Sequence, residues 1–247
     1  MNSRTSGHGD SAAAPRLGQP SAGRHRRSWA VFVGAAALLL AADLASKSAA
    51  FRLVADKAII LRRPTDVDPH VFEETDTRLV IRSDRPGSIP QLHEGRKVVP
   101  LLLNLRLTTN TGAVFGMGKG RQWFFAVISV VAIGVIVRVF FRSSPGARVL
   151  HVCLGLVLAG ALGNLYDRIM FDAVRDFFYL FPGVRLPFGL HWPNGDDRLY
   201  PWIFNVADVS LVVGVTILLL IIGRSGRPAA QATPAQKPQP AEQKVPD

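Results

Sequence analysis

Four long apolar segments dominate this sequence of 247 residues and restrict it to a membrane architecture. They cover about residues 29–50, 122–141, 149–168 and 202–223. A helix needs ~20 apolar residues to cross the hydrocarbon core of a bilayer, and each segment approaches that length with polar residues inside it. The sequence therefore predicts an α-helical polytopic membrane protein with four transmembrane helices, whose polar interruptions point to its function.

Two tails flank this apolar core, and two inserts interrupt it. Residues 1–28 form a basic arm without apolar periodicity, and residues 224–247 are rich in Pro, Ala, Gln and Lys, so both are predicted to be disordered. Residues 29–223 are predicted to form one four-span core. Its inserts, at about 51–109 and 178–201, are expected at the extracytoplasmic face.

Both inserts carry signs of ordered structure. Residues 78–82 (RLVIR) and 97–109 (KVVPLLLNLRLTT) are strand-like, although Pro100 breaks the second stretch. They predict a small extracytoplasmic β-containing region that lies on the helices. Gly, Pro and aromatic residues between 181 and 201 predict an ordered surface insert rather than a linker.

The distribution of charge and cysteine excludes several classes of protein. The net charge is +11, but Lys and Arg flank the apolar segments, so no nucleic-acid partner is expected. Cys153 is the only cysteine, which rules out an intrachain disulfide framework and a four-cysteine zinc site. Basic residues at 24–27, 142 and 148 favour a cytoplasmic N-terminus, and four spans then place both termini in the cytoplasm.

Carboxylates from three predicted helices converge at one membrane face. Asp43 lies fourteen residues beyond the start of the first span, which is about 21 Å along a helix. Asp208 lies six residues past Trp202, or about 9 Å. Asp167 ends the third span at the same face, and Asp176 follows it. A charge inside a bilayer costs at least ~2.5–3.5 kcal/mol on insertion scales, so this convergence needs a reason.

Ion pairing is the simplest reason for some of these charges. Asp43 and Lys47 stand at positions i and i+4 of one helix and are predicted to neutralise each other. Asp167 stands beside Arg168, and a carboxylate with a resident cation suits a structural or orienting role.

Asp176 and Asp208 have no obligatory cation, since Arg175 points away from Asp176 in an extended chain. Two neighbouring carboxylates in a site of low dielectric share one proton, which is the state that an aspartic protease needs. The repeated N-x-x-D pattern at 164–167 and 205–208 instead suggests a pair of Asp167 with Asp208. The spacing of the residues leaves both pairings open.

Other functions are compatible with intramembrane acids. A four-span transporter or proton-relay protein is the main alternative, although its ionisable groups would be spread through the bilayer rather than gathered at one face. A serine or serine–lysine protease is disfavoured, because Ser46 and Lys47 point in different directions on a helix and no G-x-S-x-G elbow is present. The six histidines are scattered and H-E-x-x-H is absent, so no metal ligands are expected.

Five blocks of the sequence resemble the signature blocks of the lipoprotein signal peptidase family, also called signal peptidase II. They occur in the family's order and extend over the predicted four-span core. The blocks are DLASK (43–47), NTGAVFG (110–116), GALGNLYDR (160–168), VRDF (174–177) and FNVADVSLVVG (204–214).

This resemblance implies an intramembrane aspartic endopeptidase that removes the signal peptide from diacylglyceryl-modified bacterial prolipoproteins, with cleavage before the lipidated cysteine. It implies a multi-pass protein of the bacterial inner membrane with its active site at the extracytoplasmic face. No cofactor is expected, the partners are prolipoprotein substrates and membrane lipid, and the chain is expected to be monomeric.

The resemblance also implies roles for individual residues. The two catalytic aspartates of the family correspond to Asp176 and Asp208, whereas Asp167 corresponds to a non-catalytic position. The implied substrate-binding residues are Asn110, Gly112, Asn164, Arg168 and Asn205, and the implied supporting residues are Asp43, Lys47, Asp167 and Ala207.

Three further features lie outside the implied catalytic roles. Gly155, Ala159 and Gly163 form a small-residue strip that predicts helix packing. The chain departs from the family in a longer stretch between Lys47 and Asn110 and in an extra segment at 184–199.

Overall fold

The computed structural model describes residues 21–63, 65–66, 75, 77–82, 95–112 and 122–225. The predicted disorder of both tails therefore falls mostly outside the described residues, as does the 113–116 part of the second signature block. For the last residues of the N-terminal arm the predicted disorder is wrong, because residues Ala22–Arg24 form a short 3-10 helix and the first long helix begins at Arg26.

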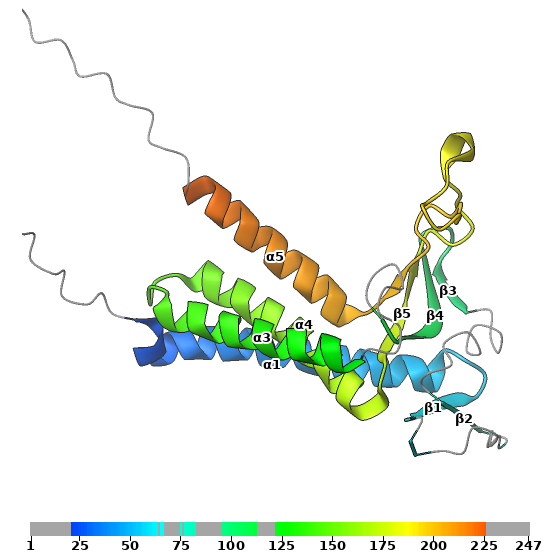
Figure 1. The fold of residues 1–247 in the computed structure, drawn as a ribbon, viewed down its shortest axis with the longest axis horizontal. Helices are drawn as coiled ribbons and strands as arrows, with labels where there is room; N and C mark the ends of the chain where they lie inside the picture. Colours follow the sequence, from blue (N-terminus) through cyan, green and yellow to red (C-terminus); the bar gives the residue numbers. More distant parts are fainter. Residues whose placement is uncertain are drawn as a thin grey trace, which may run out of the picture.

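The described residues contain four helices that are long and apolar enough to cross a membrane. They are α1 (Arg26–Leu53), α3 (Gln122–Arg142), α4 (Arg148–Phe171) and α5 (Val206–Ser225). Helix α4 packs against the other three, and Figure 1 shows α5 diverging from the bundle towards its C-terminal end. These helices confirm the predicted four-span fold.

The fourth helix begins later than predicted. Residues Ile203–Phe204 form a short strand, so the chain is extended where a helix was expected from residue 202. Asp208 is therefore in the first turn of α5, and a depth calculated from helical rise after Trp202 is wrong. Residues 203 and 204 are extended rather than helical because they pair with Tyr179 and Phe178 of a neighbouring strand.

Small residues allow the central helices to approach closely. A side chain at Gly155 would stand 2.7 Å from the carbonyl oxygen of Phe32 on α1. Gly163 faces Asp43 and Ala207, and Ala159 is buried. These contacts confirm that the strip on α4 serves helix packing.

Gly160→Ala is expected to lower stability by about 1–3 kcal/mol, the usual cost of overpacking. The new Cβ would lie 2.5 Å from the carbonyl oxygen of Ala207 and 2.5 Å from Cγ of Leu211, so α4 and α5 would have to separate. Thermal unfolding in detergent measures the effect. Gly134→Ala on α3 is the control, since a Cβ there meets nothing within 4 Å. An unchanged Tm for Gly160→Ala would contradict the close α4–α5 contact.

Two small sheets lie at one end of the helices (Figure 1). Strands β1 (Ala58–Arg62) and β2 (Arg78–Arg82) pair in parallel. The antiparallel sheet has the order β3 (Arg96–Val99), β4 (Leu103–Asn110), β5 (Val174–Leu180) and β6 (Ile203–Phe204). The strand predicted at 78–82 is observed, and the stretch 97–109 divides near Pro100 as its sequence indicated.

The β-containing region consists of two separate sheets. Strand β2 pairs with β1, while β4 pairs with β5, which was not predicted. Strand β5 lacks the alternation of a half-buried strand, because its first four residues are all buried. A buried apolar cluster joins both sheets to the end of α1 and includes Phe51, Ile59, Ile81, Leu107 and Phe177.

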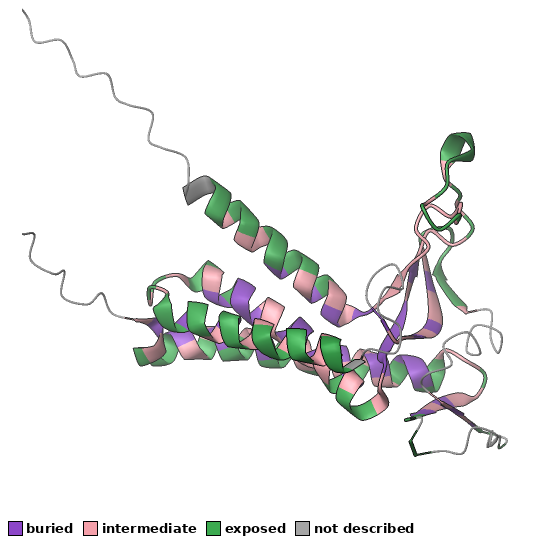
Figure 2. Ribbon diagram, in the orientation of Figure 1, coloured by how far each residue is buried: buried purple, intermediate pink, exposed green. Residues whose placement is uncertain are grey.

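The outer faces of the helices remain apolar and exposed, as expected for surfaces that contact lipid. Trp123 on α3 is 69% exposed and Leu219 on α5 is 63% exposed. Figure 2 shows exposed residues along α3 and α5, whereas buried residues are concentrated on α4 and at the base of the sheets.

Residues 181–201 form an irregular hairpin after β5. The backbone N–H of Leu199 donates to Val184, and the N–H of Leu186 donates to Asp197. The rings of Trp192 and Trp202 then pack at 4.7 Å, which fixes the base of the hairpin next to β6.

Candidate active site

Strand pairing brings Asp176 and Asp208 together from distant parts of the sequence. Asp176 lies on β5, opposite Thr108 of β4. Strand β6 pairs with β5 immediately before α5 begins, so the first turn of α5 lies beside β5. The side chain of Asn205 bridges this junction, because its Nδ2 donates to Oδ1 of Asp176 at 2.6 Å while its backbone N–H donates to Oδ2 of Asp208 at 3.1 Å.

Asn205 and Asp208 also form a reciprocal cap at the start of α5. The backbone N–H of Asp208 donates to Oδ1 of Asn205 at 3.1 Å, and the Asp208 carboxylate accepts the Asn205 N–H in return. This arrangement is a capping box, which requires the three-residue spacing of N-x-x-D. The positive end of the helix dipole further stabilises a carboxylate at this position.

A second asparagine holds the other side of Asp208. Nδ2 of Asn164, on α4, donates to Oδ1 of Asp208 at 2.8 Å. Oδ1 of Asn164 accepts hydrogen bonds from Nδ2 of Asn205 at 3.2 Å and from Nζ of Lys47 at 3.1 Å. Lys47, a buried cation on α1, thus orients the amide of Asn164, and this amide in turn orients the carboxylate of Asp208.

The two aspartates occupy different environments. Asp176 is buried, and Asp208 is partly exposed. Burial raises the pKa of Asp176 well above its usual range, and the negative charge of Asp208 raises it further. The hydrogen bond from Asn205 opposes this shift but does not reverse it. Asp176 therefore retains its proton where an ordinary carboxyl group is ionised.

Lys47 is the centre of a buried ion network. Its Nζ lies 2.8 Å from Oδ2 of Asp43 and 3.3 Å from Oδ2 of Asp167. Oδ1 of Asp43 accepts the backbone N–H of Ala207 at 2.8 Å, so the network joins α1, α4 and α5. The predicted Asp43–Lys47 ion pair is confirmed.

The prediction that Arg168 neutralises Asp167 is wrong. Asp167 instead pairs with Arg175, whose Nη2 lies 2.7 Å from Oδ1, and also accepts the backbone N–H of Arg175 at 3.0 Å. Adjacent residues on a helix project in different directions, so the side chain of Arg168 does not reach the carboxylate of Asp167. Asp172 ends α4 in a left-handed conformation with φ 55°, and this turn returns Arg175 to the side of Asp167.

Of the predicted substrate-binding residues, Arg168 lies within reach of the charges of both aspartates, and Asn110 lies opposite Val174, two residues before Asp176. Nη1 of Arg168 donates to the carbonyl oxygen of Asn164 at 3.3 Å, and its guanidinium lies 5.5 Å from the ring centre of Phe125. Oδ1 of Asn110, at the end of β4, accepts the backbone N–H of Gly112 at 3.0 Å.

Two residues near the pair, Tyr200 and Thr108, were not predicted from the sequence. The negative charge of Asp208 acts on Tyr200, whose pKa is raised mainly by burial and then by this charge. Thr108 lies opposite Asp176 in the sheet register. No spacing pattern links Thr108 to Asp176, because strand pairing brings the two together. Within the described ranges, no group of three or more His, Cys, Asp or Glu side chains is arranged to hold a metal ion.

The fold and site together define a multi-pass membrane protein with a carboxylate pair at one end of its helix bundle. The model of the signal peptidase (SPase) II family matches residues 77–223. The chain belongs to this family, which confirms the resemblance of its signature blocks.

Proteins of similar sequence support this family assignment. The chain is 37% identical to a lipoprotein signal peptidase of Shouchella clausii over 143 residues, which are 58% of this chain and 83% of the relative. It is also 37% identical over 125 residues to a lipoprotein signal peptidase of Latilactobacillus sakei, covering 51% and 72% of the two chains. A solved structure described as a bacterial membrane enzyme has the same fold, with a TM-score of 0.51 and 22% identity over 81% of this chain and 88% of that chain.

Proposed function

We propose that this protein is an intramembrane aspartic endopeptidase that removes the signal peptide from diacylglyceryl-modified bacterial prolipoproteins, with Asp176 and Asp208 as its catalytic pair. Membership of the signal peptidase II family supports a protease that acts on lipoproteins. The observation that carries the assignment of the pair is the side chain of Asn205, which contacts Asp176 and caps the helix that presents Asp208.

The two environments suit an acid and a base. Ionised Asp208 accepts a proton from water, the resulting hydroxide bonds to the scissile carbonyl carbon, and protonated Asp176 gives its proton to the carbonyl oxygen. The tetrahedral diol then returns a proton to Asp176, while Asp208 gives its proton to the leaving nitrogen as the C–N bond breaks. One water is consumed, and both carboxyl groups regain their starting states.

The remaining site residues position this pair or bind the substrate. Asn164 and Asn205 orient the carboxylates, and Asp43, Lys47, Asp167 and Ala207 hold the three helices in register. Asn110, Gly112 and Arg168 are assigned to the peptide backbone of the substrate. The charges of both aspartates act on Arg168, and Asn110, which holds the N–H of Gly112, lies opposite Val174 on the strand that carries Asp176. The enzyme is assigned as a monomer that works without cofactor or metal.

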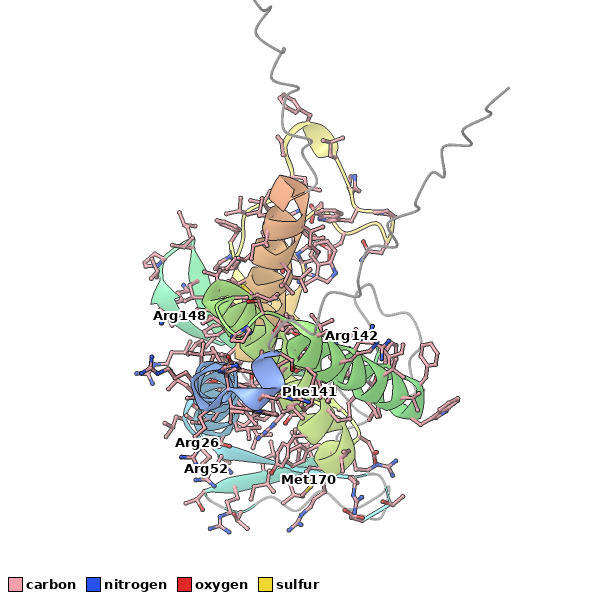
Figure 3. All side chains as sticks on the ribbon, turned by 90° about the vertical axis from the view of Figure 1, so that its left-hand side faces the viewer. Arg26, Arg52, Phe141, Arg142, Arg148 and Met170 are labelled. Atoms are coloured by element: carbon pink, nitrogen blue, oxygen red, sulfur yellow. The ribbon has the colours of Figure 1, made fainter. Side chains whose placement is uncertain are left out.

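The basic residues at the helix ends support the proposed orientation. Figure 3 looks at the bundle end opposite the sheets, at which Arg26 begins α1, Arg142 ends α3 and Arg148 begins α4. The N-terminal 3-10 helix is fixed there, since the N–H of Ala22 donates to Ser143 in the α3–α4 turn. The positive-inside rule assigns this end to the cytoplasm, so both termini are cytoplasmic and the aspartates lie at the extracytoplasmic face.

The proton-relay alternative is not favoured. Asp43, Asp167, Asp176 and Asp208 form one connected group of charges and amides, whereas a relay requires ionisable groups at successive depths.

The expected substrate is defined by its lipid. Purified protein in lipid nanodiscs should cut a diacylglyceryl-modified prolipoprotein before the modified cysteine, and the same peptide without lipid should be cut at least about tenfold more slowly, because the lipid anchor places the scissile bond at the membrane surface. Mass spectrometry of the products identifies the cut bond. Equal cleavage of both peptides would refute recognition of the lipid, and cleavage elsewhere would refute the assigned bond.

Cleavage should decline as pH rises through the higher apparent pKa of the aspartate pair. The raised pKa of Asp176 means that the protonated acid persists above the ordinary carboxyl range near ~3.9, and activity is lost when Asp176 finally ionises. Asn205→Ala removes a hydrogen bond that favours the ionised form, so the alkaline limb of kcat/KM should move to higher pH.

The control for this profile is Asp196→Asn in the hairpin. Arg198 lowers the pKa of Asp196 to about 2, so its charge is constant over the working range and the profile should not change. A shift of the alkaline limb to lower pH in Asn205→Ala would contradict the assignment of Asp176 as the acid.

A further inference from the structure

A cavity of about 710 Å³ lies between the sheet-side half of α1, the end of α4 and the parallel pair β1–β2. Its walls combine two kinds of side chain. Leu44, Phe51, Ile60 and Tyr166 contribute apolar surface, whereas Arg52, Arg78 and Arg175 contribute guanidinium groups.

The cavity is separate from the catalytic aspartates. Arg175 lines it, but the next residue on β5, Asp176, turns to the opposite side and contacts Asn205. The residues that line the cavity do not include either aspartate, Asn164 or Asn205. Strand β1 and the lining part of α1 also precede residue 77, where the match to the family model begins. The cavity is therefore a feature that the proposed function does not use.

Its basic groups differ in their availability. Arg175 is held by Asp167, and its guanidinium lies 4.5 Å from the ring centre of Phe171. Arg52 and Arg78 are exposed, and within the described part of the chain neither side chain forms an ion pair with a carboxylate. Two positive charges that have no carboxylate partner among the described residues thus stand at the rim of a partly apolar cavity.

We propose that this cavity binds one anionic phospholipid of the membrane leaflet on the sheet side. Leu44 and Ser48 belong to a membrane-spanning helix, so the apolar wall is continuous with the lipid-facing part of the bundle. Arg52 lies one to two turns further along the same helix, at the level where phosphate headgroups begin. The phosphate of the lipid contacts Arg52 and Arg78, and the first part of an acyl chain lies against Leu44 and Tyr166.

This occupant fits the walls better than a soluble anion. A free phosphate would use the arginines but leave the apolar wall in contact with water, whereas a neutral phospholipid would leave two cations facing a headgroup without net charge. An anionic phospholipid covers the apolar wall with its acyl chain and pairs its phosphate with the two arginines.

The test is native mass spectrometry of the full chain with phosphatidylglycerol and with phosphatidylcholine of identical acyl chains. The wild type should bind one phosphatidylglycerol in preference to phosphatidylcholine. Each arginine should contribute about fivefold to this preference, so Arg52→Gln with Arg78→Gln should reduce it by about 25-fold. Ser48→Phe, which fills the cavity without changing charge, should also weaken retention of the lipid.

The control is Arg96→Gln with Lys97→Gln on β3, which removes two exposed positive charges outside the cavity. It should retain the preference. The proposal is overturned if the control loses as much preference as the cavity variant, if the cavity variant retains it, or if glycerol 3-phosphate displaces the lipid at equal concentration. Prolipoprotein cleavage by the cavity variant is measured in parallel, so a failure of lipid binding is distinguished from a failure of the proposed protease function.

Discussion

Asp176→Asn and Asp208→Asn are each expected to lower kcat for prolipoprotein cleavage by about 10²–10⁴-fold, the usual contribution of one positioned acid or base. Asparagine preserves the shape of both sites. An amide oxygen at 176 still accepts the hydrogen bond from Asn205, and an amide oxygen at 208 still accepts the backbone N–H that caps α5. At 208 the new amide nitrogen replaces the oxygen that accepts from Nδ2 of Asn164, so this variant also loses one hydrogen bond. The expected loss of kcat in both variants is mainly chemical, because neither amide exchanges a proton as a carboxyl group does.

The measurement is kcat for the lipidated substrate in nanodiscs, together with the Tm of each variant. Asp172→Asn is the matched control. Asp172 carries the same functional group near the site but ends α4 in a left-handed conformation that asparagine readily adopts, so this variant should cleave normally. A wild-type rate in either Asp176→Asn or Asp208→Asn, with the fold intact, would refute the pair.

Lys47→Met is expected to reduce stability by about 3–5 kcal/mol, the range found when one partner of a buried ion pair is removed. Lys47 is completely buried and contacts Asp43, Asp167 and the amide oxygen of Asn164. Asp167 retains Arg175, but Asp43 loses its cation inside the bundle. Chemical or thermal unfolding in detergent measures the loss, and cleavage should fall in parallel because Asn164 is no longer oriented.

A double variant separates the lost charge from the lost volume. Asp43→Asn combined with Lys47→Met removes both charges and keeps an oxygen for the N–H of Ala207, so it should be more stable than Lys47→Met alone. Arg52→Met, at an exposed position of the same helix, should leave stability within about 0.5 kcal/mol of wild type. If the double variant is no more stable than the single one, an uncompensated Asp43 is not the cause of the loss.

The sequence predicts the helices well because each one satisfies its backbone hydrogen bonds locally, and a membrane span must be apolar over a length that is visible in the sequence. The start of α5 was misplaced for the opposite reason. Residues 203 and 204 form a strand only because β5 lies next to them, and β5 itself pairs with β4, more than sixty residues earlier in the chain. Such pairing leaves little local signal.

The site shows the same contrast. The Asp43–Lys47 pair was predicted because both residues lie on one helix at a fixed spacing. The true partner of Asp167 was not, because Arg175 reaches it only through the left-handed turn at Asp172. Spacing also left open whether Asp167 or Asp176 accompanies Asp208, and the resemblance to a family supplied the choice. The proposed pair is compatible with the contacts of these residues, since Asp167 is paired with two cations while Asp176 shares Asn205 with the helix that carries Asp208.

The ion network forms from two segments of the chain, each of which pairs its own carboxylate with a cation before the helices pack together. This local pairing affects how the helices enter the membrane during synthesis. Asp43 has its cation four residues away on α1, and Asp167 has one eight residues away, so neither carboxylate depends on a helix that has not yet been made. The first and third spans are therefore able to enter the membrane with their charges already balanced. Asp208 arrives on the last helix, and the nascent chain lacks the complete pair that we propose as catalytic until that helix has been translated and docked.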